Sequence, residues 1–124
     1  MSRHYDQEVL TAKTAADSTG IGYFTGIPGA TNKNGSLAAS AQVTEYGIYT
    51  EFDHTSAAGT VLIETASDPN YTGTWAVLAT INWAAIDKSH YTALTNTLRC
   101  LRVRISSAVT SGTVTVRVVA NTIG

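Results

Sequence analysis

The chain has 124 residues, of which 44% are hydrophobic and 14% charged, so its length and composition allow one domain with a packed core. A net charge of −1 gives the chain as a whole no electrostatic attraction to nucleic acid or to an anionic membrane. No apolar run approaches the roughly 20 residues that span a bilayer, and the N-terminus lacks the hydrophobic region of a secretory signal. Cys100 is the only cysteine, which excludes an intrachain disulfide and is typical of a chain made in a reducing cytoplasm.

Residues 1–40 are rich in Thr, Ala, Gly and Asn and contain few large apolar side chains. Short strands are predicted at Glu8–Thr11 and Gly22–Ile27, and the remainder is expected to be loop or an extended arm. We therefore predict a loop-rich N-terminal segment over 1–40, followed by a β-domain over 41–124.

From residue 41 onward, apolar and polar residues alternate with the period of a β-strand. The alternation predicts strands in VTEYGIYTEF, GTVLIETAS, TWAVLATI, RCLRVRI and TVTVRVVA. The side chains expected to point inward are Tyr46, Ile48, Phe52, Trp75, Val77, Ala79, Ile81, Leu101, Val103, Ile105, Val114, Val116, Val118 and Ala120. The segment NWAAIDKSHYTALTN breaks this pattern. Asn82 can cap a helical turn there, but the segment is too short to predict a stable helix.

Turn residues separate the predicted strands. Asp68-Pro69-Asn70 suits a turn, because Pro69 presets its φ and both Asx side chains can bond the local backbone. The sequence SAVTSG predicts a turn that pairs the last two strands as an antiparallel hairpin. Several short strands without helical blocks predict an all-β fold, either an antiparallel β-sandwich or a jelly-roll-like barrel, with an extended N-terminal region.

The residue types that bind metals are scattered along the chain. Asp68 and Asn70 have the i, i+2 oxygen spacing that opens calcium loops, but the later acidic ligands are missing, so an Asx turn is favoured. His4, His54 and His90 lie in separate segments, and no pair has metal-ligand spacing. We predict no metal and no cofactor.

Two segments contain nucleophile types. Asp53-His54-Thr55-Ser56 holds the residues of a hydrolase triad, but neighbours on a strand point to opposite faces and cannot form a relay. Cys100 lies near arginines that favour a thiolate, yet no histidine is placed beside it as a base. A small, partly covered strand residue is the better interpretation of Cys100. We predict no catalytic residue.

Aromatic residues cluster in sequence around one predicted corner. Tyr71, Trp83 and Tyr91 are candidates for a sugar-stacking surface, which would make the chain a carbohydrate-binding module. Trp75 instead fits the phase of the core, and large aromatic residues more often fill cores or subunit contacts.

Charge is distributed unevenly. Residues 1–87 contain all 9 acidic residues and three basic ones, whereas residues 88–124 contain five basic residues and no acid. Arg102, Arg104 and Arg117 are expected to share the polar face of the predicted hairpin, where three like charges repel unless acidic groups pair with them. These acidic groups lie either on adjoining strands of the same chain or on a neighbouring subunit. The intramolecular candidates are Glu45, Glu64 and Asp53.

From about Val43 to Ala120 the chain resembles small phage virion β-sandwich proteins. The resemblance lies in GTVLIETASDPNYTGTWAVLATI and in LRCLRVRISSAVTSGTVTVRVVA, a strand with alternating arginines followed by a valine-rich last strand. The resemblance implies a head decoration or cement protein, or a neck or tail component, with no catalytic residue.

These observations together predict a non-enzymatic virion structural protein, made in the host cytoplasm. A capsid decoration or cement protein is favoured, and the alternatives are a tail or neck component or a carbohydrate-binding module. The expected partners are the major capsid protein or other virion subunits, with Arg102, Arg104 and Arg117 as candidate contacts. A homo-oligomer is expected, with a trimer favoured, and no nucleic acid or membrane partner.

Overall fold

The computed structural model describes residues 3–17, 20–24, 43–53, 55–67, 71–83, 89–95 and 100–122. These residues form eight strands: β1 (Arg3–Lys13), β2 (Ile21–Tyr23), β3 (Val43–Phe52), β4 (Thr60–Thr65), β5 (Ala76–Asn82), β6 (Ser89–Leu94), β7 (Arg102–Ser107) and β8 (Val114–Thr122). The described residues contain no helix, so the predicted all-β class is confirmed.

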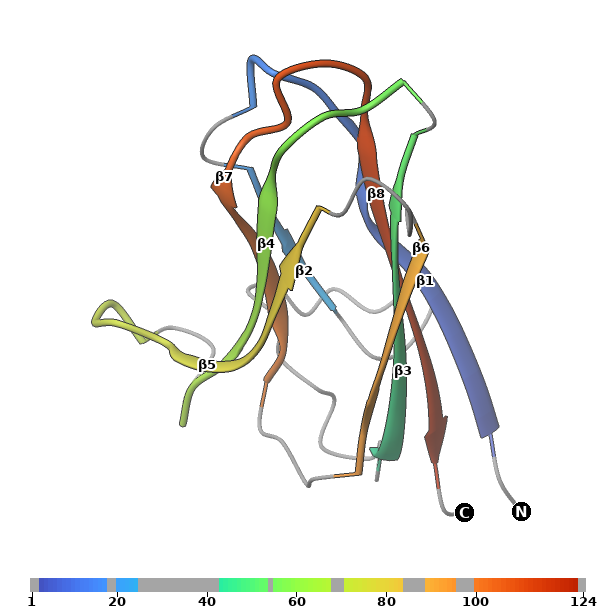
Figure 1. Ribbon diagram of the computed structural model, residues 1–124. Helices are drawn as coiled ribbons and strands as arrows, with labels where there is room; N and C mark the ends of the chain where they lie inside the picture. The colour runs from blue at the N-terminus through green and yellow to red at the C-terminus, as the bar shows by residue number, and fades with distance from the viewer. Residues whose placement is uncertain are drawn as a thin grey trace.

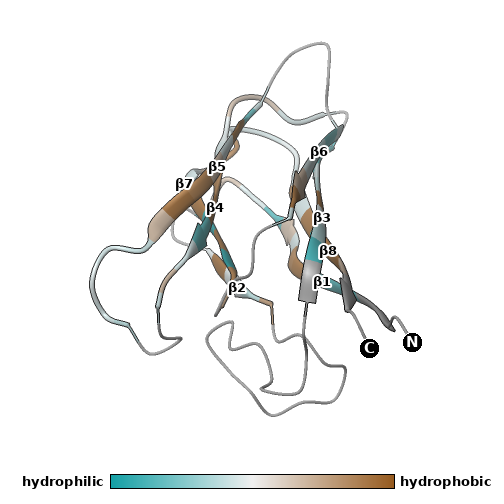
Figure 2. Ribbon diagram, turned by 90° about the horizontal axis from the view of Figure 1, so that it is seen from below, coloured by the Kyte–Doolittle hydropathy of each residue, from teal (hydrophilic) through white to brown (hydrophobic). Residues whose placement is uncertain are grey.

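The strands form two antiparallel sheets of four that face each other (Figure 1). We call the sheet with strand order β1-β8-β3-β6 sheet A, and the sheet with order β2-β7-β4-β5 sheet B. Figure 2 shows them as two separate layers, with β1 and β2 on one lateral side and β5 and β6 on the other. The sheets are not joined into a closed barrel, so the fold is the antiparallel sandwich of the two predicted alternatives.

Both sheets contribute their inward side chains to one core. Sheet A provides Leu10, Tyr46, Ile48, Phe52, Val114, Val116, Val118 and Ala120, and sheet B provides Val61, Ile63, Ile81, Val103 and Ile105. Burial of these apolar side chains is the main favourable term in folding. The predicted inward phase is therefore confirmed for the strands around Tyr46, Val103 and Val116.

The predicted hairpin of the last two strands is wrong, because β7 lies in sheet B and β8 in sheet A. Residues 108–113 cross from one sheet to the other, and Val109 on this connection is buried in the core. The connection is fixed to the one between β3 and β4 by hydrogen bonds from Thr110 N to Ala57 O (2.8 Å) and from Ser111 Oγ to Thr55 O (2.8 Å). Figure 1 shows both connections, β3–β4 and β7–β8, at the same end of the sandwich. Alternation cannot distinguish the two arrangements, since strands paired in a sheet and strands facing across a core bury the same alternate residues.

Gly112 makes the close approach of these two connections possible. Its φ of +68° lies in the left-handed region, and a Cβ at this position would lie 2.6 Å from Ser56 N. Only glycine accepts both conditions without strain.

Parts of residues 1–40 are strands of the sandwich. β1 pairs with β8 and contains the predicted strand Glu8–Thr11, and β2 pairs with β7. β1 and β2 are therefore not part of the predicted N-terminal arm. Residues 25–42 lie outside the described part of the chain.

The segment that breaks the predicted pattern contains a strand, β6, which pairs with β3. Asn82, which was considered as the cap of a helical turn although no stable helix was predicted, ends β5, and residues 84–88 lie outside the described residues. Alternate residues of β6 are exposed and partly buried, but two of the partly buried ones, His90 and Thr92, are polar, while the exposed Tyr91 is aromatic. Apolar and polar residues therefore do not alternate in this strand, and its sequence could not reveal it.

Candidate functional site

The outer face of sheet B carries a buried carboxylate between two arginines. Glu64 on β4 pairs in register with Arg102 on β7, and its side chain is 1% exposed. Arg102 Nε donates to Glu64 Oε1 (2.8 Å), and Arg104 donates from Nε to Oε1 (3.1 Å) and from Nη2 to Oε2 (3.1 Å). Since two cations share one anion, this cluster keeps one positive charge.

Opposing effects set the pKa of Glu64. Burial alone would raise the pKa, but hydrogen bonds from Arg104 and Arg102 and the charges of both outweigh burial and hold the pKa below its ordinary value. The same hydrogen bond to Glu64 raises the pKa of Arg104. Glu64 and Arg104 therefore stay charged near neutral pH.

Trp75 covers one side of this cluster. The Arg102 guanidinium carbon lies 4.2 Å from the centroid of the Trp75 ring, a cation–π contact, and Tyr23 meets Trp75 edge to face at 6.4 Å. The indole Nε1 of Trp75 donates to Tyr71 O (3.0 Å). Trp75 is 3% exposed, yet it is buried against outward-facing residues and not in the central core, so its predicted core position is wrong.

A β-bulge explains this error. Ile63 on β4 pairs with Ala79 on β5, but the next residue, Glu64, pairs with Val77, which leaves Leu78 as an extra residue. The extra residue reverses the phase of β5 on its N-terminal side. Val77 is consequently 50% exposed, and its predicted inward orientation is also wrong.

Arg117 lies on the other side of the molecule, on the outer face of sheet A. It donates to Asp6 Oδ1 (2.6 Å) and to Glu8 Oε2 (3.0 Å), and all three side chains are between 32% and 49% exposed. These ion pairs raise the pKa of Arg117, mainly through the hydrogen bond to Asp6.

The prediction that Arg102, Arg104 and Arg117 share one face is therefore wrong. Glu64 was among the predicted intramolecular acids, whereas Asp6 and Glu8 were not. Their pairing with Arg117 depends on the register of β1 against β8, more than 100 residues away in sequence, which no local pattern reveals.

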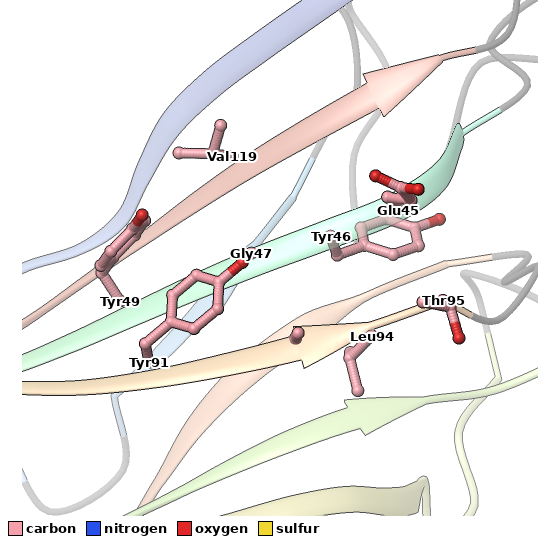
Figure 3. Close-up of a pocket in the computed structure, with 9 residues that line it drawn as sticks. Glu45, Tyr46, Gly47, Tyr49, Tyr91, Leu94, Thr95 and Val119 are labelled. Atoms are coloured by element: carbon pink, nitrogen blue, oxygen red, sulfur yellow. The ribbon is translucent and has the colours of Figure 1, made fainter.

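The same face of sheet A has a shallow depression of about 240 Å³ over Gly47 (Figure 3). Its lining residues are Glu45, Tyr46, Gly47, Tyr49, Tyr91, Ala93, Leu94, Thr95 and Val119. Tyr49 on β3 and Tyr91 on β6 are partners in register, with ring centroids 4.9 Å apart and a tilt of 52°. They are 39% and 59% exposed, which makes them an outward-facing aromatic pair.

The missing side chain of Gly47 shapes this depression. A Cβ on Gly47 would lie 2.8 Å from the Tyr91 hydroxyl, so the Tyr91 ring extends over the glycine and covers its backbone. Tyr46 lines the depression but is itself buried, and burial raises its pKa to about 12. The pair Tyr49–Tyr91 thus offers apolar ring surface with hydroxyls beside it, a combination suited to binding by contact.

The predicted aromatic surface of Tyr71, Trp83 and Tyr91 is not one surface. Tyr91 pairs with Tyr49, which sequence reasoning missed, although the alternation around Tyr46 and Ile48 places Tyr49 on the outer face. Tyr71 is exposed in the segment before β5, where its carbonyl accepts the Trp75 indole N–H. Trp83 packs partly buried against the core, and its backbone N–H donates to Gly59 O (3.0 Å).

The remaining candidates are the triad-like segment, the cysteine and the metal-binding residue types, and those that the structure describes form no catalytic arrangement. The Asp53 carboxylate accepts hydrogen bonds from Thr55 N (2.6 Å) and Thr55 Oγ1 (2.8 Å), as in an Asx turn, while His54 lies outside the described residues. Cys100 was predicted to be a small, partly covered strand residue, but it is fully buried, and its thiol donates to Ala66 O (3.2 Å). Asp68 and Asn70 lie outside the described residues, as does the side chain of His4.

Within the described part of the chain, no group of three or more His, Cys, Asp or Glu side chains is arranged to hold a metal ion. No helix there is long and apolar enough to cross a membrane. In comparisons with known proteins, no family model matches this chain, and no curated protein matches it either.

Proposed function

We propose that this chain is a non-enzymatic virion structural protein, most simply a capsid decoration or cement protein, that contacts the major capsid protein or another virion subunit through the outer face of sheet A. The observation that carries the proposal is the exposed Tyr49–Tyr91 pair over the Gly47 depression. Tyrosine is enriched at protein interfaces because its ring is apolar and its hydroxyl finds a polar partner.

The surroundings of the pair favour contact with a protein. Arg117, the cross-strand partner of Tyr49, is paired with Asp6 and Glu8, so this cluster keeps one negative charge, which a basic group of the partner can meet at the rim of the contact. The tyrosines lie on neighbouring strands of a hydrogen-bonded sheet, and a rigid platform loses little conformational entropy on binding. Many identical weak contacts on a lattice then add up to stable attachment.

The resemblance to phage virion proteins also supports the proposal. The two segments that carry it span β4 and β5 in the first case and β7 and β8 in the second. They provide the central strands β4, β7 and β8 and the edge strand β5. Of the candidate contact arginines, Arg104 and Arg117 are 35% and 44% exposed and remain suited to an interface rim. Arg102, at 14%, is held beneath the surface by Glu64 and Trp75.

The test is to locate the protein on purified virions by electron microscopy with a labelled antibody, and then to measure binding of variants to particles that lack it. We expect Tyr91→Ala and Tyr49→Ala to lower particle occupancy. Tyr71→Ala, which removes a tyrosine of intermediate exposure elsewhere, should not lower it. The position of the label distinguishes head from neck or tail. A protein absent from virions would refute the proposal.

A carbohydrate-binding module is the second candidate, and the same tyrosine pair favours it. Aromatic rings stack on sugar rings, and Glu45 and Thr95 line the same depression with groups that can bond sugar hydroxyls. Glycan-array binding that is lost in Tyr91→Ala and retained in Tyr71→Ala, together with no label on virions, would favour this module over the structural protein.

A further inference from the structure

The two lateral sides of the sandwich end in different kinds of edge strand. On one side lie β1 and β2, which approach closely: Gln7 Nε2 donates to Tyr23 O (3.0 Å), and a Cβ on Gly22 would overlap Val9 O. β1 carries Arg3, Asp6, Glu8 and Lys13 and has two register irregularities, and β2 has three residues. Charges, bulges and short strands are the features by which natural proteins prevent an edge from pairing with another chain.

The other side has none of those charges, and β5 has a single register irregularity, the bulge at Leu78, against two on β1. β5 has the sequence AVLATIN and β6 has SHYTAL, and neither strand contains Asp, Glu, Lys, Arg or Pro. β5 has seven residues, and among the described strands only β4 pairs with it, so one row of its backbone N–H and C=O groups faces away from sheet B. Val77 on this strand is 50% exposed.

We propose that β5 pairs with β5 of a second copy of this chain, antiparallel and about a two-fold axis, so that two copies of sheet B form one continuous sheet. An antiparallel strand pair is self-complementary under two-fold symmetry. The absence of charge on β5 matters here, because identical charged strands brought together in this way would place like charges side by side. Pairing would satisfy the outward backbone groups and bury Val77.

β5 is the better of the two uncharged edges for this contact, and its bulge at Leu78 leaves Ala79–Asn82 as the regular stretch for pairing. It is the longer strand, and its partly buried Leu78 and Ala79 and exposed Val77 make it the more apolar one. On β6, the large exposed side chain is Tyr91, which is turned toward Tyr49 on the face of sheet A. The proposed contact therefore lies apart from the tyrosine surface, and it does not depend on the function proposed above.

The experiment is sedimentation velocity of the full chain over a range of protein concentrations. We expect the wild type to be a dimer in the micromolar range, and not the trimer favoured from the sequence. The double variant Val77→Glu/Thr80→Glu places like charges along the paired edges and should be monomeric over that range, with its dimer dissociation constant raised by at least about tenfold. Val77 is the cross-strand partner of Glu64, but that carboxylate is buried between two arginines in a cluster with one net positive charge, and Thr80 is exposed opposite Leu62. The monomer fold should therefore be retained, and a far-ultraviolet circular dichroism spectrum like that of the wild type verifies this.

The matched control is Ala93→Lys on β6, an exposed site near Glu45, which should remain dimeric. Hydrogen exchange adds a position-specific measurement: amides of β5 should gain protection as concentration rises, while those of β6 should not. A wild type that stays monomeric, a trimer, a double variant that still dimerises, or loss of the dimer in Ala93→Lys alone would each overturn the proposal.

Discussion

The two outer faces of the sandwich pair their arginines with carboxylates in different ways. On sheet B, Arg102 and Arg104 enclose a carboxylate that is 1% exposed, with the Trp75 ring stacked under one guanidinium. On sheet A, Arg117 meets two carboxylates that are 49% and 32% exposed. Sheet A has more anions per arginine, yet we expect sheet B to be the more sensitive to substitution.

The difference lies in access to water. Ion pairs on an exposed face add little to the stability of the fold, because water solvates the two separated charges almost as well as they stabilise each other. A buried charge has lost that solvation, and removing its partner leaves the loss uncompensated. The number of ion pairs is therefore a poor guide to their importance, and burial of the central group is a better one.

The largest expected effect is that of Glu64→Ala. This change leaves Arg102 and Arg104 side by side without their anion, and we expect the free energy of unfolding to fall by about 2–4 kcal/mol, limited by the ability of Arg104 to turn toward solvent. Urea denaturation at neutral pH measures the change. Glu45→Ala removes an exposed carboxylate and is the control, and equal midpoints for the two variants would contradict the importance of burial.

An intermediate effect is expected on acid stability. The folded pKa of Glu64 lies below its ordinary value of 4.5, so its contribution to stability is fully present above about that pH and is lost as pH falls toward the folded pKa. We expect wild type and Glu64→Gln to differ by a constant amount near neutral pH and to converge in acid. Thermal midpoints measured across this range test the prediction, and a difference that grows as the pH falls would have the wrong sign.

The smallest effect is expected for Arg117→Ala. The exposed pairs with Asp6 and Glu8 should add little, so the thermal midpoint should stay close to that of the wild type. The remaining difference should shrink further when salt is added, because salt screens exposed charges. Thermal denaturation at low and high salt gives the measurement. A loss as large as that of Glu64→Ala would show that the two faces are not distinguished by burial.

Local sequence patterns gave correct predictions where the inward or outward orientation of a residue depends only on its position along its own strand. Alternation placed Ile48, Val103 and Val116 inside, and all three are fully buried. The same rule failed at Trp75 and Val77, because the single extra residue of the β5 bulge is defined by pairing with β4 and leaves no mark on the sequence of β5.

The candidate sites were harder to predict than the core. Tyr91 was identified as an exposed aromatic, but its companion Tyr49 comes from a strand more than 40 residues earlier and is brought beside it only by the register of β3 against β6. Glu64 was correctly included among the candidate anions, while the separation of Arg117 from Arg102 and Arg104 required knowing which sheet each strand joins.

The sequence by itself determined the all-β class and the inward face of most of its strands, because both follow from the spacing of apolar residues along one strand. Only the tertiary structure decided which strands are neighbours, that β7 and β8 face each other across the core, and which arginine is buried with which acid. These outcomes depend on contacts between residues far apart in the chain, and a period of two is the same whether a strand's neighbour lies beside it in a sheet or opposite it across the core.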